Sequence, residues 1–488
     1  MKKPTSIQKK IIGFEGNTVV TASPGSGKTY CLVEKIRVTI PELLEYEGVI
    51  AITFTNKASR EIKNRLKGEK CDNLFIGTLD SFYFSEIILP FTHYITRKRE
   101  KIEIIETEKN DEIEKLLFSN EIPLKRLAEI SLYILKNVPQ SRLYLKSKYK
   151  LILIDEYQDC SDIQHEIFKF IVDMGIIGFC VGDINQSIYK FAEKSSKYLE
   201  AIVSDKKFKH FELIENKRSH KSITDYSSRV LNENYLTTID KDIRVKKVSV
   251  NGDERHSIKG IEKILEKVKE TYDIQHNNQI AILCRSNQAV SRLSSFFEIP
   301  NKVYLENPLK KLKLRTLIMI NLTVLFEGFF EFKLEQTTIT EFCDSIYNLS
   351  EKDKRCLKQI ITDIFNSEQI IECMNLINSY LFYCGDLKLN SAEYIELVNF
   401  LKEINDLSFF RPAQNNEIQI MNFHKSKGLE FDAVFIFDNH RYVFPFEYDN
   451  KFSDFEEDLR LHYVSISRAS KICYLMQGKF AYYFPRIH

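Results

Sequence analysis

The sequence predicts an α/β fold with two domains, each interrupted by a helical insertion. Short apolar runs recur along the chain, and each is followed by polar residues or glycine. Helical stretches lie between most of these runs, and two longer stretches, at about 90–145 and 305–410, look helical throughout. A short apolar run of this kind indicates a buried parallel strand. Strands that alternate with helices are typical of a doubly wound sheet.

The predicted strands form two series. The first comprises Thr18–Thr21, Val49–Thr53, Lys150–Ile154, Phe179–Val181 and Phe211–Ile214. The second comprises Gln279–Cys284, Gln419–Phe423, Ala433–Phe437 and Ile472–Met476. Their order predicts a first domain of residues 1–90 and 146–225, with 91–145 as a small helical insertion. A second domain would comprise 226–304 and 411–488, with 305–410 as its helical insertion.

The composition is that of a globular chain and leaves nucleic acid binding to local surfaces. The 488 residues suggest about three folded units. Lys and Arg number 70 against 68 Asp and Glu, so the overall charge does not point to a nucleic acid partner. No apolar segment of a signal peptide follows the basic N-terminus, and the longest apolar stretch, Thr316–Phe326, is too short for a bilayer. We therefore expect a cytoplasmic protein without a membrane partner.

A phosphate-binding loop follows the first predicted strand. The segment reads Ala22-Ser23-Pro24-Gly25-Ser26-Gly27-Lys28-Thr29, with Ala22 at the first glycine position. Gly25 and Gly27 let the backbone N–H groups close around an anion, and Ser23 and Ser26 belong to the same cradle. The Lys28 side chain would reach the β- and γ-phosphates, and the Thr29 hydroxyl would bind Mg²⁺. The alternative, a glycine-rich turn before a helix, does not account for the complete pattern.

A pair of carboxylates ends a later predicted strand. The segment Leu151–Ile154 is followed by Asp155 and Glu156. Asp155 can hold Mg²⁺ through its water shell, and Glu156 can orient and deprotonate an attacking water molecule. A solvated acidic turn would give the same pattern, but a nucleoside triphosphatase needs both this pair and the phosphate-binding loop.

Further motifs follow in a fixed order along the chain. They are Thr53–Ala58, Gly77–Phe82, Val181–Tyr189, Asn216–Ser219, Ala281–Ser286, His424–Phe431 and Tyr463–Ala469. With these motifs the chain resembles the UvrD/Rep/PcrA-like superfamily 1 DNA helicases over nearly its full length. The resemblance implies two recA-like P-loop motor domains that hydrolyse ATP with Mg²⁺. It also implies movement in the 3′→5′ direction on single-stranded DNA, or on DNA with a single-stranded tail.

The resemblance assigns further residues to the nucleotide. Gln8 would read adenine and Glu430 would bind the ribose, while Gly428 would approach the γ-phosphate. Three residues would act on the phosphoryl group: Gln186 as a γ-phosphate sensor, and Arg218 and Arg468 as arginine fingers. Guanidinium groups stabilise the charge that phosphoryl transfer spreads over the departing phosphate.

The adenine pocket departs from the family pattern. Relatives place an arginine directly after the loop threonine and a tyrosine before the first arginine finger. This chain has Tyr30 and Lys217 at those positions. We hypothesise that Tyr30 stacks on adenine while Lys217 covers the other face. The alternative is one-sided stacking with a solvated Lys217.

The resemblance also implies a DNA-binding face. Its candidate residues are Phe54, Thr55, Asn56, Thr78, Tyr189, Phe191 and His424. Aromatic residues can stack on bases of any sequence, although each aromatic could instead be a core residue. Asp80 stands where relatives usually carry histidine, and an acidic side chain that faces phosphate is unfavourable. Relatives also carry an arginine directly after the aromatic residue at 191, where this chain has Ala192.

A second functional reading comes from the short length and trimmed insertions. In these respects the chain resembles the helicase-like GajB subunits of Gabija antiphage systems, which accompany an OLD-family nuclease. That resemblance implies a regulatory ATPase that senses DNA or nucleotide and controls a nuclease partner. A nucleotide-dependent switch without nucleic acid is a third reading, against which the ordered DNA motifs argue.

Overall fold

The computed structural model describes most of the chain. The described residues are 4–66, 68–69, 71, 73–98, 102–105, 111–188, 196–232, 234–236, 241–249, 253–345, 351–385, 387–402, 407–437, 447–448, 451–452 and 455–477. They divide into two compact units. Unit 1 comprises Met1–Glu103, Thr107–Ser249 and Ser426–His488, and unit 2 comprises Ile104–Glu106 and Val250–Lys425. The predicted division into two motor domains and two insertions stays a prediction.

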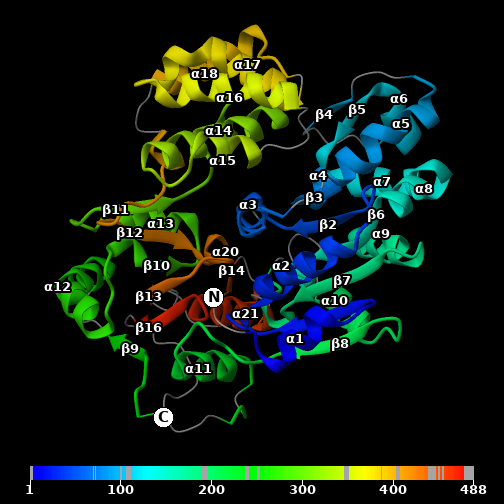
Figure 1. The fold of residues 1–488 in the computed structure, drawn as a ribbon. Helices are drawn as coiled ribbons and strands as arrows, with labels where there is room; N and C mark the ends of the chain where they lie inside the picture. The colour runs from blue at the N-terminus through cyan, green and yellow to red at the C-terminus, as the bar shows by residue number, and fades with distance from the viewer. Residues whose placement is uncertain are drawn as a thin grey trace. The chain divides into compact units, whose positions relative to one another are not determined.

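Unit 1 is built on a six-stranded parallel sheet (Figure 1). Its order is β3-β2-β6-β7-β1-β8. The strands are β1 (Thr18–Ala22), β2 (Gly48–Thr53), β3 (Asn73–Thr78), β6 (Tyr149–Ile154), β7 (Ile177–Gly182) and β8 (Lys209–Leu213). Because the strands are parallel, the segments that follow them emerge at one edge of the sheet. This sheet confirms the predicted α/β class.

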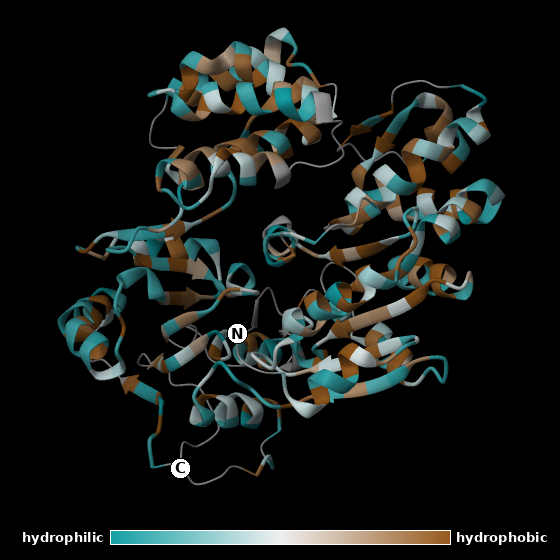
Figure 2. Cartoon of the chain, in the orientation of Figure 1, coloured by the Kyte–Doolittle hydropathy of each residue, from teal (hydrophilic) through white to brown (hydrophobic). Residues whose placement is uncertain are grey.

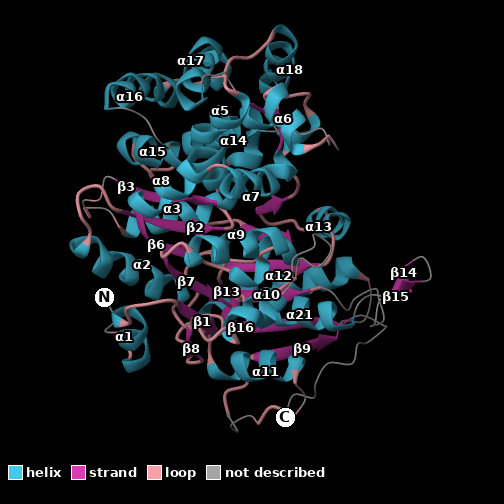
Figure 3. Ribbon diagram, turned by 90° about the vertical axis from the view of Figure 1, so that its right-hand side faces the viewer, coloured by secondary structure: helices cyan, strands magenta, loops and turns pink. Residues whose placement is uncertain are grey.

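The helices of unit 1 alternate with its strands. They are α1 (Ser6–Gly13), α2 (Lys28–Thr39), α3 (Asn56–Arg65), α4 (Leu79–Phe82), α5 (Leu89–Thr96), α6 (Ile113–Ser119), α7 (Leu127–Asn137), α8 (Pro139–Lys148), α9 (Asp162–Asp173), α10 (Lys197–Val203), α11 (Lys221–Leu231) and α21 (Phe455–Ile466). Between α5 and α6 begins a short strand, β4 (Glu103–Ile105), and β5 (Glu121–Pro123) follows α6. Figure 3 shows strands and helices by colour.

Both faces of the sheet are buried. Alternate strand residues such as Val20 and Phe179 share one core with Ile11 of α1 and Leu32 of α2. Gly178 faces the opposite side, where an added Cβ would lie 2.6 Å from the Val172 side chain of α9. Burial on both faces explains the continuous apolar runs in the sequence, which are brown in Figure 2.

Three further strands belong to unit 1. They lie in the order β13-β16-β9, and both pairings are parallel. Their bounds are β13 (Phe431–Ile436), β16 (Ala469–Gln477) and β9 (Val245–Ser249). Two short antiparallel strands, β14 (Glu447–Tyr448) and β15 (Lys451–Phe452), complete the described strands of this unit.

Unit 2 combines three parallel strands with a group of helices. The strands lie in the order β11-β12-β10 and comprise β10 (Ile280–Cys284), β11 (Asn301–Tyr304) and β12 (Ile418–Asn422). The helices are α12 (Glu254–Tyr272), α13 (Asn287–Ser294), α14 (Thr316–Lys333), α15 (Ile339–Ser345), α16 (Glu351–Asn366), α17 (Met374–Gly385), α18 (Ser391–Lys402) and α20 (Phe423–Ser426). Helices α14 to α18 share a hydrophobic core that runs from Leu309 to Phe410. The described residues between 305 and 410 contain no strand, as the sequence predicts.

All nine predicted strands are present, with ends shifted by a few residues. The sequence missed β3, β9 and β11, which each lie at one end of their row of strands. It also missed the short strands β4, β5, β14 and β15, and β4 and β5 show that the stretch 90–145 is not helical throughout. A strand at an edge is less deeply buried and therefore lacks a continuous apolar run. Among the described residues, no helix is long and apolar enough to cross a membrane.

We expect Gly328→Ala to destabilise unit 2. An added Cβ at Gly328 in α14 would lie 2.1 Å from the ring of Phe342 in α15. Overpacking costs about 1–3 kcal/mol, and the better helix propensity of alanine offsets about 1 kcal/mol. Urea unfolding followed by circular dichroism should show a lower free energy of unfolding. The control is Gly260→Ala in α12, where an added Cβ would meet no atom of the described chain within 4 Å. A Gly328→Ala variant as stable as this control would contradict the packing.

Candidate nucleotide site

Three neighbouring strands of unit 1 carry the candidate site at their carboxyl ends. Strand β1 leads into the loop 23–27, β6 ends before Asp155, and β7 ends before Asp183. These strands are adjacent in the order β6-β7-β1. Residues far apart in the sequence therefore meet at one edge of the sheet.

The loop after β1 has the backbone shape that its glycines allow. Gly25 has a φ of 68° and Gly27 a φ of 93°, both in the left-handed region. The segment that carries Arg218 lies directly against this loop, since the Lys217 N–H donates to the Gly25 carbonyl at 2.9 Å. A Cβ on Gly25 would lie 2.7 Å from the Arg218 Cβ. Glycine is thus required both for the turn and for this close approach.

The structure places Gln8 and Lys217 together beside the loop. Gln8 is 3% exposed, and its Nε2 donates to the Ser26 carbonyl at 3.2 Å. Its Oε1 accepts hydrogen bonds from the Thr5 N–H at 3.0 Å and from Lys217 Nζ at 3.3 Å. Tyr30 is half-buried in the first turn of α2. The predicted adenine residues therefore lie around the start of α2.

Lys28 and Glu156 form an ion pair at the centre of the site. Lys28 Nζ lies 3.5 Å from Glu156 Oε1. Burial lowers the pKa of Lys28, but the carboxylates of Glu156, Asp183 and Asp155 outweigh it and raise the pKa above its usual value. Burial likewise raises the pKa of Glu156, but Lys28 and Lys427 together with other donors hold it at about 2. Both groups are therefore charged at neutral pH.

Asp155 carries an excess of negative charge that suits a cation. Its side chain is 6% exposed, and burial and the neighbouring Glu156 raise its pKa to about 7. A divalent cation would compensate this charge, and carboxylate and hydroxyl oxygens are the ligands that Mg²⁺ prefers. Asp155 and the Thr29 hydroxyl, at the start of α2, are the residues that would hold it. The donor set thus fits Mg²⁺.

Glu156 has a strained backbone and a fixed side chain. Its φ of 53° is left-handed, which is costly for a residue other than glycine and often marks a functional position. Gln158 Nε2 donates to Glu156 Oε2 at 2.5 Å. The left-handed turn and this hydrogen bond hold the carboxylate on the side of Lys28.

Gln186 and Arg468 meet in the same network. Gln186 Nε2 donates to Asp183 Oδ2 at 2.8 Å, and Arg468 Nη2 donates to Gln186 Oε1 at 3.2 Å. Arg468 is 3% exposed, and burial together with Arg218 lowers its pKa to about 10. Arg468 remains protonated at neutral pH, and its charge acts on both Lys28 and Glu156.

Arg218 lies near Arg468 and contacts Glu430. Its Nη1 forms an ion pair with Glu430, and its Nη2 donates to the Ser467 carbonyl at 3.0 Å. Its buried Nε has no hydrogen-bond partner among the described residues. An unmatched guanidinium N–H beside a phosphate-binding loop fits an anionic ligand. Gly428, with a φ of 79°, lies two residues before Glu430.

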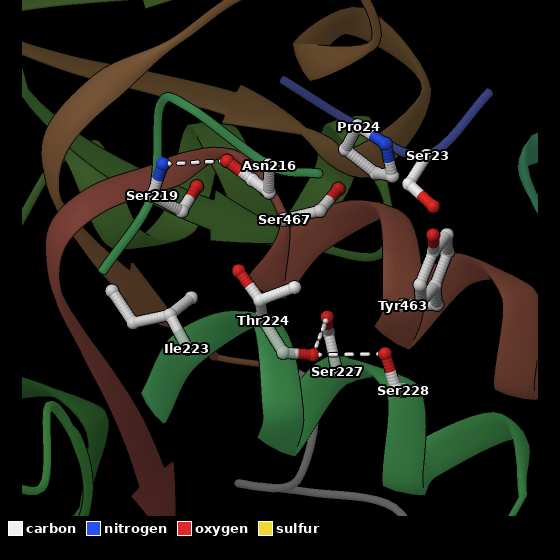
Figure 4. A pocket seen from close by; sticks show the side chains of 10 residues that line it. All are labelled: Ser23, Pro24, Asn216, Ser219, Ile223, Thr224, Ser227, Ser228, Tyr463 and Ser467. Atoms are coloured by element: carbon white, nitrogen blue, oxygen red, sulfur yellow. Dashed lines mark hydrogen bonds between the residues drawn. The ribbon is translucent and has the colours of Figure 1, made fainter. Parts of the chain in front are cut away.

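A hydroxyl-lined pocket extends from the loop toward α11 and α21 (Figure 4). Its lining includes Ser23 from the loop, Ser219, Thr224 of α11, and Tyr463 and Ser467. The Tyr463 hydroxyl donates to Asp183 Oδ2 at 3.5 Å. The polar lining therefore joins the arginine segments to the phosphate-binding loop.

Two of the DNA candidates, Thr55 and Thr78, are positioned as helix caps. Thr55 caps α3 by accepting from the Ala58 N–H at 3.2 Å, and Thr78 caps α4 by accepting from the Ser81 N–H at 3.3 Å. Both caps lie at the carboxyl edge of the unit 1 sheet, because α3 follows β2 and α4 follows β3. Phe54, directly before the first cap, is half-buried.

Two further DNA candidates lie in helices of the described chain. Asn56 is the first residue of α3, and His424 lies in α20. Tyr189 and Phe191 lie outside the described residues. Asp80, the acidic departure in the second DNA motif, is exposed in α4.

The structure adds residues to the site that had no role in the sequence reading. These are Gln158, Asp159, Asp183, Lys427 and Tyr463. Lys427 forms a buried ion pair with Asp159 at 2.5 Å and also donates to the Gln186 carbonyl at 2.8 Å. Asp183, Lys427 and Tyr463 lie inside the quoted motifs, and Gln158 and Asp159 follow Glu156 within three residues. The sequence therefore contained all five residues without revealing their partners.

Two family models match the chain. The UvrD/REP helicase N-terminal domain matches residues 5–133 and 113–207. The UvrD-like helicase C-terminal domain matches residues 326–478.

Curated proteins give the same result over most of the chain. Gabija protein GajB of Bacillus cereus is 29% identical, over 97% of this chain and 95% of its own length. ATP-dependent DNA helicase PcrA of Staphylococcus epidermidis is 23% identical, over 94% of this chain and 81% of its own length. ATP-dependent DNA helicase Rep of Buchnera aphidicola is 24% identical, over 94% and 90%. The matched motor motifs, the geometry at the sheet edge and both family models together show that the chain belongs to the UvrD/Rep family of helicases.

Proposed function

We propose that this chain is an ATP-dependent helicase or translocase that moves 3′→5′ on single-stranded DNA in the cytoplasm. The observation that carries the proposal is the convergence of Lys28, Glu156, Gln186 and Arg468 in one network of ion pairs and hydrogen bonds. Such an arrangement combines a phosphate-binding cation, a general base, a sensor and a guanidinium group, which are the parts that phosphoryl transfer requires.

Each side chain has a chemical task in ATP hydrolysis. Glu156 is ionised, so its carboxylate accepts the proton of the attacking water. Lys28 and Arg468 stabilise the charge that develops on the phosphoryl oxygens. Bound Mg²⁺, held by Asp155 and Thr29, would supply further neutralisation of the phosphates. Arg218 has to exchange its contact with Glu430 for the nucleotide before it can act as the first finger.

The sheet offers a route from hydrolysis to DNA. The Asp155 N–H donates to the Ile52 carbonyl at 3.0 Å, two residues before Phe54. The strand that ends in the DNA candidates is therefore hydrogen-bonded to the strand that ends in the catalytic pair. The family's two motor domains would close over the nucleotide and advance along the strand, which is the gating role of such motions.

A second candidate function is favoured by the similarity to Gabija protein GajB. That match spans 97% of this chain and 95% of the relative, whereas the match to PcrA covers 81% of the helicase. The chain would then act as a DNA- or nucleotide-sensing ATPase subunit in antiphage defence, with an OLD-family nuclease as its partner. The nucleotide chemistry would be the same in both functions.

The first prediction concerns ATP hydrolysis. We expect wild-type ATPase activity with Mg²⁺ to rise when single-stranded DNA is titrated in. Lys28→Ala should lower kcat by about a hundredfold or more, because it removes charge stabilisation in the transition state. Glu156→Gln should lower kcat by about 10²–10⁴-fold, because the amide cannot accept the proton. Lys115→Ala, an exposed lysine of α6, serves as the control. If single-stranded DNA did not change the ATPase rate, the result would contradict the helicase proposal and favour a nucleotide-dependent switch without nucleic acid.

The second prediction concerns direction. Duplexes with a 3′ single-stranded tail should be unwound, and duplexes with a 5′ tail should not, in a strand-displacement assay with ATP. Lys28→Ala should abolish displacement on both substrates. Preference for the 5′ tail would refute the proposed polarity while leaving ATP hydrolysis intact.

The third prediction concerns the adenine pocket. Aromatic stacking contributes about 0.5–1.5 kcal/mol, so Tyr30→Ala should weaken ATP binding by about two- to tenfold. Titration with a fluorescent adenine nucleotide measures the change. Tyr46→Ala, at a tyrosine that is 61% exposed, should leave the affinity unchanged. Equal affinities for Tyr30→Ala and wild type would show that Tyr30 does not stack on the base.

The two candidate functions differ in their behaviour with partners. Robust strand displacement by the isolated chain favours the helicase. Tight binding to a co-expressed OLD-family nuclease, together with feeble displacement, favours the regulatory subunit.

A further inference from the structure

We propose that Gln158 positions the general base Glu156 and couples it to the sensor segment Asp183–Gln186. This inference rests on the proposed ATP hydrolysis. Gln158 lies in η4 (Tyr157–Asp159), two residues after Glu156, and its side chain is 0% exposed. Because the amide is shielded from solvent, its hydrogen bonds are made to protein groups.

The two ends of the Gln158 amide bind two different parts of the site. Nε2 donates to Glu156 Oε2 at 2.5 Å, and Oε1 accepts from the Asp183 N–H at 3.0 Å. A carboxylate can only accept and a backbone N–H can only donate, so the amide has one possible orientation. Methionine has a similar length but could make neither bond.

The second bond connects the base to the phosphate sensor. Asp183 accepts from Gln186 Nε2 at 2.8 Å, and Gln186 accepts from Arg468 at 3.2 Å. A continuous chain of hydrogen bonds therefore runs from Glu156 through Gln158 and Asp183 to Gln186. A movement of Gln186 on contact with a γ-phosphate would displace Asp183 and, through Gln158, the carboxylate of Glu156.

The packing at Gly182 is a second observation on the position of the Gln158 amide, because the amide occupies the space that a side chain at 182 would need. An added Cβ on Gly182 would lie 2.5 Å from Gln158 Oε1, 2.9 Å from Leu199 Cδ2 and 3.2 Å from the Gln158 backbone nitrogen. The φ of Gly182 is not in the left-handed region, so the absence of a side chain serves the close approach of Gln158. Gly182→Ala should therefore push the amide away from Asp183 and Glu156.

The test measures steady-state hydrolysis and nucleotide binding on the full chain. Gln158→Met should lower the kcat of DNA-stimulated hydrolysis by about tenfold or more, because a small displacement of a catalytic group has a large effect on rate. KM and the affinity for a fluorescent ATP analogue should stay within about twofold, because Gln158 does not face the phosphates. Gly182→Ala should give the same pattern.

A double variant separates positioning from general destabilisation. If both substitutions act by displacing one amide, Gln158→Met with Gly182→Ala should lower kcat no further than either alone. The proposal would be overturned if the fold-losses in kcat of the two single variants multiplied in the double variant, or if kcat and ATP affinity fell together. If Gln158→Met does not fold, Gly182→Ala decides by the same split between kcat and KM.

The matched control is Gln164→Met in α9. Gln164 also accepts from a backbone N–H, that of Ser161 at 2.9 Å, but it caps a helix away from the site. This variant should lose stability in thermal unfolding and keep its kcat. If the wild-type chain hydrolyses ATP and Gln158→Met has the same kcat, this inference would be overturned while the proposed function would stand. A wild-type chain without ATPase activity would overturn the proposed function as well.

Discussion

The ion pair between Lys28 and Glu156 is the interaction on which the rest of unit 1 depends. It brings opposite charges together at the ends of two non-adjacent strands, β1 and β6, where Asp155 and Asp183 add further negative charge. Buried charges are tolerated only when they are paired. Lys28, Lys427 and Arg468 supply that pairing, so the segments that bring them are fixed by charge balance as much as by packing.

This balance also explains why the site can respond to a nucleotide. Several candidate ligand groups already bind one another: Lys217 contacts Gln8, and Arg218 contacts Glu430. The net free energy of nucleotide binding is the difference between the contacts that the nucleotide makes and the contacts that it replaces. Under the proposed function, nucleotide binding would therefore require the segments 216–219 and 426–430 to exchange these contacts. A site filled by its own side chains converts nucleotide contact into movement, whereas a preformed empty cradle would not.

The sequence predicted the inner strands and the residue types at their ends, because both follow from burial and parallel order. Val49–Ile52 and Leu151–Ile154 are apolar since both faces of the sheet are covered. The edge strand β9 was missed because two exposed lysines, Lys246 and Lys247, interrupt its apolar residues. The hydrogen-bond partners of the polar side chains could not be predicted either, since the sequence gives the positions of Gln158 and Lys427 but not the groups that they contact. Hydrogen-bond direction and close approach, as at Gly182, exist only in three dimensions.

The order of strands gives the shortest physical link between the two halves of the function. Candidate nucleotide residues follow β6, β7 and β1, DNA candidates follow β2 and β3, and the boundary between the two groups runs between β2 and β6. At that boundary the Asp155 N–H donates to the Ile52 carbonyl, and Thr53 Oγ1 donates to the Thr55 carbonyl at 2.9 Å. A shift of Asp155 is thus felt at the cap of α3 through backbone that is already hydrogen-bonded. Because protein interiors are closely packed and rigid, such a short connection needs no long pathway through side chains. Under the proposed function, the hydrogen bonds between β2 and β6 would couple hydrolysis to DNA contact directly.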